Sequence, residues 1–365
     1  MGIQYDDIGP AKILQIYAPQ VPFKAMVVVD NTARGPALGG VRVSPEVDVE
    51  EVYRLARTMT FKSAVADLPH GGGKAGIIAD PKDPNIERIF RTFARLIGNL
   101  SDYIPAPDMG CHEGAMAWIH DEIGRVAGLP EEIGGLPLDK LGATGFGLAE
   151  CAEIACGHAG IELSGARVAI QGFGSVGRAA ARFFAEKGAR IVAASDSRGA
   201  VQDSQGLPLE SLCNAKDREG TVKACREGRD IEGEALFGVD CDILIPAATP
   251  DVINEGNAPG IKARLILEGA NIPATGEAER MLAGRGVLIV PDFIANAGGL
   301  IMAAMEYAGR GETESFAAIT EKIRANTARI LDKARDEKIL PRQAAEGIAR
   351  ERVENAMRYR EYSYS

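Results

Sequence analysis

Several features are scarce in this sequence of 365 residues, and each absence excludes a class of protein. No apolar run approaches the roughly 18 residues that a membrane-spanning helix needs. Lysine and arginine number 41 against 51 aspartates and glutamates, and the resulting net charge of −10 argues against a nucleic-acid-binding protein. The first ten residues lack the basic and apolar regions of a secretion signal, and Asp6 stands where a myristoylation motif needs serine or threonine. We therefore expect a cytoplasmic protein that binds neither membrane nor nucleic acid.

Metal-binding and redox motifs are also missing from the sequence. Its six cysteines and four histidines are scattered, with no CxxC pair among them. Cys111 and His112 are adjacent, but this pair alone does not make a metal site. In the absence of a secretion signal we expect the cysteines to be reduced thiols. We expect no metal, so the chemistry has to come from lysine, aspartate and main-chain groups.

The N-terminal part of the chain has the pattern of an α/β domain. A hydrophobic fraction of 46% and a charged fraction of 25% are typical of globular proteins, and the length predicts two domains. Residues 1 to about 20 are expected to form a short helix before the sheet. Apolar periodicity predicts helices at 48–66, with Asp48 as N-cap, and at 85–100. β-branched runs predict strands at 24–30, within 34–45, and at 76–79.

From Ala166 the pattern changes to strand, glycine turn, helix and strand, followed by apolar runs at 242–246, 264–268 and 287–291. Continuous apolar runs are typical of buried parallel strands, so this half predicts a doubly wound sheet of Rossmann type. We expect residues 1–140, joined by a return of about 330–365, to form a substrate-binding and oligomerisation domain. Residues 141–329 would form a dinucleotide-binding domain, with the active site in a cleft between the two.

The glycine turn carries the strongest motif, GxGxxG at Gly172, Gly174 and Gly177 with Phe173, Ser175 and Val176 between. It follows an apolar strand and opens a helix, as dinucleotide-binding turns do. The first glycine permits the tight turn, the second lets the pyrophosphate approach, and the third lets helix and strand pack closely. Asp196 ends the next strand and would accept hydrogen bonds from the adenine ribose, which favours NAD. Ser197 and Arg198 follow it and could instead hold the 2′-phosphate of NADP.

The stretch Thr58 to Gly76, TMTFKSAVADLPHGGGKAG, holds two lysines around three consecutive glycines. Lys62 follows the apolar Met59 by one helical turn, so it lies near the buried edge of its helix. Gly71–Gly73 form a turn in this interpretation, which brings main chain close to a ligand and leads to Lys74. Two cations delivered to one place suggest a small anionic substrate. The alternative is a surface lysine beside a glycine-rich loop.

A carboxylate stands in a second candidate motif, PAPDMG, where Asp108 lies between prolines and a glycine. Burial would raise its pKa and make it an acid/base group, whereas a second lysine and a water-poor site would lower the pKa of a catalytic lysine. The alternative for Asp108 is a turn or helix-cap aspartate. Asn271 and Asn296 have a similar alternative as turn residues, and Thr144 is either a helix N-cap or a contact to the carboxamide.

In order along the chain, these motifs resemble those of the amino acid dehydrogenase superfamily, which contains glutamate, leucine, phenylalanine and valine dehydrogenases. The resemblance spans roughly residues 24–310 and is carried by GPALGGVR (35–42), TMTFK…LPHGGGKAG (58–76), PAPDMG (105–110), LGATG (141–145), the glycine turn, EGANIPAT (268–275) and PDFIANAGG (291–299). It implies that Lys62 binds the substrate α-carboxylate, that Lys74 polarises the carbonyl or the attacking water, and that Asp108 shuttles protons at the amino group. Asn271 would lie beside the reacting carbon and the nicotinamide. The resemblance also implies further cofactor contacts from Thr144, Ala247, Ala248 and Asn296, and a homo-oligomer, hexameric or octameric in relatives.

The substrate side chain is expected to meet a pocket lined by Leu38, Met59, Ala106, Leu300 and Ala303, and Gly39 and Gly40 are also expected to contact the substrate. Glutamate dehydrogenases resembling this chain carry a lysine and a serine where it has Leu38 and Ala303. A γ-carboxylate beside Leu38 would be a buried unpaired charge, so we expect an apolar amino acid. Glutamate is the alternative, because YIPAPDMG and GGLPLDKLGATGFG resemble glutamate dehydrogenases and Lys140 could meet a carboxylate.

Two different classes compete with an amino acid dehydrogenase. A catalytically silent dinucleotide-binding regulator would be expected to lack Lys74 or Asp108, and both are present. A hydroxyacid dehydrogenase on the same fold would use a His/Arg pair, and no histidine here lies in a suitable motif. The sequence therefore predicts reversible oxidative deamination of an L-amino acid with hydride transfer to NAD(P).

Overall fold

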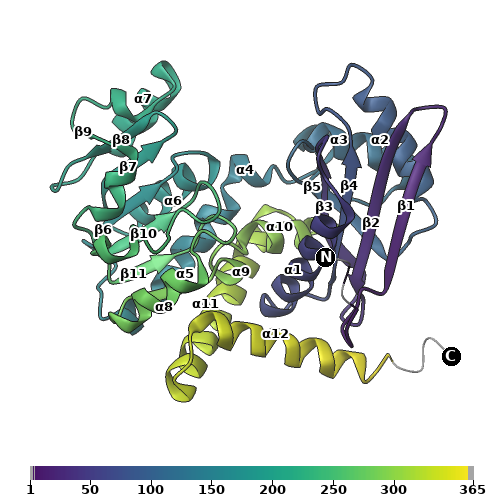
Figure 1. Cartoon of the computed structure of the whole chain (residues 1–365). Helices are drawn as coiled ribbons and strands as arrows, with labels where there is room; N and C mark the ends of the chain where they lie inside the picture. Colours follow the sequence, from purple (N-terminus) through teal and green to yellow (C-terminus); the bar gives the residue numbers. More distant parts are fainter. Residues whose placement is uncertain (1–2, 4, 361–365) are drawn as a thin grey trace. The chain divides into compact units, whose positions relative to one another are not determined.

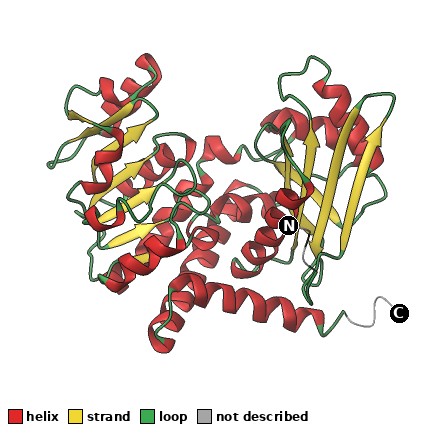
Figure 2. Ribbon diagram, viewed as in Figure 1, coloured by secondary structure: helices red, strands yellow, loops and turns green. Residues whose placement is uncertain are grey.

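The computed structural model describes residue 3 and residues 5–360, which fold into two compact units (Figures 1 and 2). Unit 1 comprises the chain up to Leu138, Leu300–Ala318 and the chain from Glu346. Unit 2 comprises Asp139–Gly299 and Ile319–Ala345. The sequence suggested a single return to the first domain near residue 330. Instead, the chain enters unit 1 a second time at Leu300 and a third time at Glu346.

Unit 1 is built on a five-stranded sheet in the order β1-β2-β4-β3-β5. Strand β2 is antiparallel to β1 and β4, whereas β3 is parallel to both β4 and β5. The strands and the helices of this part are β1 (Lys12–Ala18), β2 (Phe23–Asn31), β3 (Ala37–Val43), β4 (Gly71–Ile78), β5 (Tyr103–Pro107), α1 (Val49–Val65), α2 (Ile86–Leu96), α3 (Glu113–Ile123) and the 3₁₀ turn η1 (Glu131–Ile133).

Helices cover both faces of this sheet. On one face, Val52 and Ala56 of α1 pack with Met26 and Val28 of β2. On the other, the aromatic side chains of α2 and the apolar side chains of α3 pack with alternate residues of β2, β3 and β4. Helix α1 begins where predicted, because Asp48 accepts a hydrogen bond from the Glu51 amide (2.8 Å) and caps the first turn. The predicted helix at 85–100 is α2.

The expectation of a short helix in residues 1–20 is wrong. Lys12–Ala18 form strand β1, which pairs with β2 over its whole length, from Lys12 opposite Val29 to Ala18 opposite Phe23. The segment KILQIYA alternates between half-buried and exposed residues over much of its length, which is the period of a strand at the edge of a sheet. Pairing with a long neighbouring strand therefore decides its conformation.

The three glycines Gly71–Gly73 are not a turn but the first residues of β4. A Cβ on Gly71 would lie 1.8 Å from the Asn31 carbonyl oxygen, and one on Gly72 would lie 2.0 Å from the Thr60 amide nitrogen of α1. A side chain at either position would clash with backbone. The glycines thus allow helix α1 and strand β2 to pack closely on β4, rather than reversing the chain.

Unit 2 contains a seven-stranded sheet in the order β12-β11-β10-β6-β7-β8-β9. The run from β12 to β7 is parallel, and β8 and β9 are added antiparallel, which confirms the doubly wound α/β fold. The strands are β6 (Arg167–Gln171), β7 (Arg190–Asp196), β8 (Gly199–Gln202), β9 (Arg229–Ile231), β10 (Ile243–Pro246), β11 (Leu265–Leu267) and β12 (Leu288–Val290). The antiparallel pair β8 and β9 was not predicted.

Helices α5 and α6 pack against each other in unit 2, and α8 packs with the 3₁₀ segments η3 and η4 beside the strands. Remaining helical elements are α4 (Leu138–Leu141), α5 (Ala143–Ala159), α6 (Ser175–Glu186), α7 (Leu209–Glu219), η2 (Val222–Ala224), η3 (Gly233–Gly238), η4 (Ala258–Gly260), α8 (Gly276–Gly284), α9 (Asp292–Ala295), α10 (Gly298–Tyr307), α11 (Glu312–Glu337) and α12 (Pro341–Met357). Across the described residues, no helix combines the length and the apolarity needed to cross a bilayer.

Candidate functional site

Lys74 and Asp108 meet within unit 1. Lys74 lies in β4 opposite Val28, whose side chain packs toward α1, so Lys74 is on the α1 face of the sheet. Asp108 follows directly after β5. The Lys74 ammonium nitrogen lies 3.1 Å from Asp108 Oδ2, with the lysine side chain 7% exposed and the aspartate 21%. The two groups that the sequence singled out for proton transfer therefore form a largely buried ion pair.

A third charged residue, Arg42, completes this cluster and was missed in the sequence analysis. Its Nε donates to Asp108 Oδ2 over 2.9 Å, and its Nη1 bonds the carboxylate of Glu51 in α1. Arg42 lies in β3 two residues beyond Gly40 and four beyond Leu38, so all three share one face of the strand. This even spacing within GPALGGVR is the sequence signal that could have found it.

Both glycines of this motif are required by close packing. A Cβ on Gly40 would lie 2.6 Å from Asp108 Cβ and 3.1 Å from Lys74 Nζ. A Cβ on Gly39 would lie 1.7 Å from the carbonyl oxygen of Gly73 in β4. Gly40 therefore leaves room for the charged pair, whereas Gly39 lets the neighbouring strand approach.

The electrostatics of the cluster give the two groups distinct properties. Burial lowers the pKa of Lys74 below its ordinary value of 10.5, and the positive charge of Arg42 lowers it further, against the opposing effect of Asp108. Burial raises the pKa of Asp108, but the charges of Lys74 and Arg42 outweigh it and hold the value below 3.8. The expected raised pKa for Asp108 is thus wrong, because two cations surround it. Lys74 can give up a proton more readily than a solvated lysine, while Asp108 rests as a carboxylate.

The other predicted substrate contacts of unit 1 lie on three elements. Lys62 and Met59 are half-buried on α1, with Lys62 in its last turn. Leu38 is fully buried in β3, on the face that also carries Gly40 and Arg42. Leu300 and Ala303 lie on α10, the former half-buried and the latter buried. Substrate contacts by these residues stay predictions.

In unit 2 the glycine turn has the geometry of a phosphate-binding cradle. Gly172 adopts a left-handed φ of 93°, and a Cβ on Gly177 would lie 2.0 Å from the Gly172 carbonyl oxygen. Gly174 is exposed and a Cβ there would meet no atom within 4 Å, so it leaves an open space over the turn. Helix α6 begins at Ser175 without a side-chain cap, and the first amides of a helix can bind an anion. These features fit the pyrophosphate of a dinucleotide.

The aspartate predicted to bind the ribose already accepts several hydrogen bonds in the structure. Asp196 ends β7, and its side chain is 5% exposed. Its Oδ2 accepts from the Lys216 ammonium (2.8 Å) and the Val222 amide (2.9 Å). Its Oδ1 accepts from the Arg198 amide (2.9 Å) and the Thr221 hydroxyl (3.1 Å). Lys216 and Thr221 were not predicted, since no motif links α7 to the end of β7.

Of the remaining predicted cofactor residues, two asparagines contact each other. Asn296 Nδ2 donates to Asn271 Oδ1 (3.2 Å) and to the main-chain oxygens of Gly269 and Ala270, so it holds the loop that carries Asn271. Asn271 is exposed, and the buried Asn296 Oδ1 has no partner. Thr144 lies inside the first turn of α5, after the capping residue Gly142, and is therefore not an N-cap. Ala247 and Ala248 follow β10 and border Gly172.

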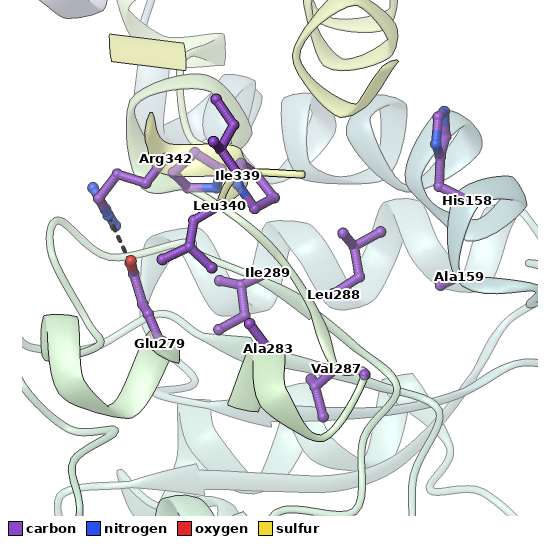
Figure 3. A pocket seen from close by; sticks show the side chains of 13 residues that line it. His158, Ala159, Glu279, Ala283, Val287, Leu288, Ile289, Ile339, Leu340 and Arg342 are labelled. Atoms are coloured by element: carbon purple, nitrogen blue, oxygen red, sulfur yellow. Dashed lines mark hydrogen bonds and ion pairs between the residues drawn. The ribbon is translucent and has the colours of Figure 1, made fainter. Parts of the chain in front are cut away.

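Behind this loop, Arg342 binds three carboxylates within unit 2. Its nitrogens lie 2.7 Å from Glu268, 2.6 Å from Glu279 and 3.0 Å from Asp292. Arg342 and Glu279 also line a cavity of about 340 Å³ between α8, β12 and the connection from α11 to α12 (Figure 3). None of the predicted site residues lines this cavity.

Comparisons with known proteins place this geometry in a family. One protein-family model, described as Glutamate/Leucine/Phenylalanine/Valine dehydrogenase, matches residues 134–361. A second family model, described as Glu/Leu/Phe/Val dehydrogenase, dimerisation domain, matches residues 18–125. Glutamate dehydrogenase of Thermotoga maritima is 43% identical over 302 residues, covering 78% of this chain and 72% of the relative. NAD-specific glutamate dehydrogenase of Staphylococcus aureus is 39% identical over 351 residues, covering 90% and 84%.

Solved structures agree with this assignment. The hetero-hexameric glutamate dehydrogenase of Thermus thermophilus, in a Leu-bound form, has a TM-score of 0.85 at 30% identity, covering 96% of this chain and 90% of that one. The L-tryptophan dehydrogenase of Nostoc punctiforme has a TM-score of 0.77 at 26% identity, covering 96% and 98%. The chain belongs to the glutamate/leucine/phenylalanine/valine dehydrogenase family of NAD(P)-dependent amino acid dehydrogenases.

Proposed function

We propose that this chain catalyses the reversible oxidative deamination of an L-amino acid to its 2-oxo acid and ammonia, with Lys74 and Asp108 as catalytic residues. The observation that carries this proposal is the 3.1 Å contact between the buried Lys74 ammonium and Asp108. A silent dinucleotide-binding regulator has no need for a largely buried ion pair of this kind. Keeping such a pair out of water costs free energy, and active sites are where such costs are commonly found.

The chemistry assigns a separate task to each residue. The glycine turn Gly172–Gly177 would hold NAD(P), which would supply the acceptor for the hydride of the substrate Cα. Lys62 holds the α-carboxylate, and Lys74 assists the attack of water on the resulting iminium carbon by taking its proton. Asp108, a carboxylate at rest, receives this proton from Lys74 and passes it to the amino group, so that ammonia leaves and the 2-oxo acid remains. The lowered pKa of Lys74 suits a group that has to exchange protons during each turnover.

L-Glutamate is the first candidate substrate. Relatives that are 43% and 39% identical are named glutamate dehydrogenases, and they match most of this chain. These names favour glutamate, which was the alternative in the sequence analysis, over the apolar amino acid expected there. With glutamate, the side-chain carboxylate would need a cationic partner in the pocket.

An amino acid with an apolar side chain is the second candidate, and Leu38 favours it. Leu38 is fully buried and lies on the same face of β3 as Gly40, which borders Lys74 and Asp108. A side chain that contacted Leu38 would gain about 0.8 kcal/mol for each buried CH₂ group. An L-tryptophan dehydrogenase also shares the fold at 26% identity over nearly the whole chain.

A spectrophotometric assay of the purified protein separates these candidates. Reduced nicotinamide formation is measured with a panel of L-amino acids that includes glutamate, leucine, valine, phenylalanine and tryptophan, each with NAD and with NADP. Activity with glutamate alone supports the first candidate, and activity with the apolar amino acids alone supports the second. Absence of activity with every amino acid, while NAD still binds, would overturn the proposed function.

We further propose that the chain assembles as a homo-oligomer. The N-terminal family model is described as a dimerisation domain, and the Thermus relative is hetero-hexameric. Light scattering coupled to size-exclusion chromatography measures the mass directly against the 38.6 kDa of one chain. A monomer at micromolar concentration would contradict this proposal.

A further inference from the structure

The hydrogen bonds of Asp196 differ from what an NAD-selective aspartate requires. In dinucleotide-binding folds, a carboxylate at this position accepts hydrogen bonds from the adenine ribose, and its negative charge repels a 2′-phosphate. Here each oxygen of Asp196 already accepts from one main-chain amide and one side chain. The side chain is also only 5% exposed. A ribose hydroxyl would have to compete with four existing donors.

The charge of Asp196 is balanced as well. The Lys216 ammonium lies 2.8 Å from Oδ2, and the lysine side chain is 27% exposed, so it contacts both the carboxylate and solvent. Burial raises the pKa of Asp196, but the hydrogen bonds from Lys216 and from the Arg198 and Val222 amides hold it below 3.8. The carboxylate is ionised and paired, so its repulsion of a nearby anion is largely cancelled.

A second cation borders the same turn. The Arg198 guanidinium donates to the Glu219 main-chain oxygen over 2.9 Å and lies over Gly220, directly after α7. Arg198 is exposed, as is its neighbour Ser197. Lys216, Arg198 and the ionised Asp196 together give the end of β7 one net positive charge, and Ser197 adds a hydroxyl group. Such a set can bind a phosphate dianion.

We propose that Lys216 is the residue that sets cofactor specificity, by neutralising Asp196 and attracting the 2′-phosphate, so that the enzyme accepts NADP as well as NAD. This inference rests on the proposed function, because it concerns the cofactor of the same reaction. The glycine turn would bind NAD and NADP alike, so the residues at the end of β7 have to distinguish the two cofactors. The Staphylococcus relative is named NAD-specific, so the inference separates this chain from that protein.

Calorimetric titration of the whole 365-residue chain with two fragments tests the proposal without any turnover. The fragments are 2′,5′-ADP, which carries the distinguishing phosphate, and 5′-AMP, which lacks it. The unmodified protein is expected to bind 2′,5′-ADP at least as tightly as 5′-AMP. Lys216→Met should weaken 2′,5′-ADP binding by about ten- to a hundred-fold, the usual range for one charge-assisted contact, and leave 5′-AMP within about two-fold.

Lys187→Met is the matched control. Lys187 pairs with Glu150 and Glu153 of α5 and follows the last residue of α6, at the opposite end of that helix from the glycine turn. Its loss should change neither affinity. Lys216→Arg keeps the positive charge and should retain most of the 2′,5′-ADP affinity.

Two results would overturn the proposal. One is an unmodified protein that binds 5′-AMP but has no measurable affinity for 2′,5′-ADP, an outcome that needs no variant to fold. The other is an equal loss of both affinities in Lys216→Met, which would make Lys216 a structural residue. Failure of the proposed function looks different, since the fragments would bind as expected while no amino acid is oxidised.

Discussion

The ammonium of Lys74 and the carboxylate of Asp108 lie 3.1 Å apart although they come from strand β4 and the end of strand β5. Strand β3, which carries Gly40 and Arg42, runs between these two strands. The absent Cβ of Gly40 leaves the space in which the pair meets, and Arg42 donates to the same carboxylate oxygen. Residues of β3, of β4 and of the end of β5 thus form one charged cluster, which we propose as the proton-transfer unit.

Loss of either member of the pair should remove most of the activity. Asp108→Asn and Lys74→Met are each expected to lower kcat by about a hundred- to ten-thousand-fold, the usual contribution of a general acid or base. The double variant should lose little more than the worse single variant, because the groups act together. Initial rates with the best amino acid of the panel provide the measurement. Loss in the double variant equal to the product of the two single losses would show that the residues act independently.

The pH dependence of kcat reports on Lys74. Its pKa lies below 10.5, chiefly because of burial and in part because of Arg42. The neutral amine is the form that accepts a proton, so deamination should become faster as pH rises, with a midpoint below 10.5. Removing the positive charge in Arg42→Met should raise the pKa of Lys74 and shift this midpoint to higher pH. A midpoint that stays in place in Arg42→Met would contradict the assignment.

Two adjacent glycines of β3 should respond differently to alanine. In Gly40→Ala the new methyl group would lie 2.6 Å from Asp108 Cβ, 2.9 Å from the Pro107 main-chain oxygen and 3.1 Å from Lys74 Nζ, so kcat should fall strongly, with a smaller loss of stability than in Gly39→Ala. In Gly39→Ala it would lie 1.7 Å from a main-chain oxygen of β4, so the sheet itself should be destabilised. Thermal unfolding and activity are measured for both variants. The same unfolding temperature in both would contradict this division.

The sequence predicted elements whose signal is local. The cap at Asp48, the periodicity of α1 and α2 and the glycine turn at 172–177 all lie within short stretches, and the structure has them there. The helix expected in residues 1–20 is a strand, because pairing with β2 decides its conformation and a single sequence does not show that partner. Gly71–Gly73 were interpreted as a turn because glycine permits turns and close approach equally well.

Lys74 and Asp108, the pair proposed as catalytic, could be named from their motifs, but their surroundings could not. The pKa of Asp108 is lowered by Lys74 and Arg42, against an expectation based on burial alone. Lys216 reaches Asp196 from a helix 20 residues further along the chain. Such contacts are made by folding, and no spacing rule in the sequence describes them.

Arg342 is expected to stabilise unit 2 by balancing three carboxylates. Arg342→Met would leave Glu268, Glu279 and Asp292 buried without their cation, which should lower the free energy of unfolding by about 3–5 kcal/mol. Burial raises the pKa of Glu268 above 4.5, and the charge of Arg342 opposes that rise. A carboxyl group with a raised folded-state pKa loses its stabilising effect as pH rises, so the loss in Arg342→Met should grow above pH 4.5.

Urea denaturation followed by circular dichroism at several pH values measures this effect. Arg324→Met is the matched control, since its side chain is 41% exposed and its partner Glu150 keeps the Lys187 contact at 2.9 Å. The control should cost no more than about 1 kcal/mol. Equal losses in the two variants would show that the buried cluster has no special role.

The side-chain preference can be tested by exchanging the two residues that favour an apolar substrate. Leu38→Lys supplies a cation on the face of β3 that borders Lys74, and Ala303→Ser supplies a hydroxyl group on α10. If these positions contact the substrate side chain, the double variant should gain kcat/KM for glutamate and lose it for leucine, because a γ-carboxylate then has a partner and an apolar side chain meets a charge. General damage to the enzyme would lower kcat/KM for both amino acids, so a gain for glutamate together with a loss for leucine shows a change in specificity. An enzyme already specific for glutamate, with the double variant no better, would show that another cation of the chain binds the γ-carboxylate.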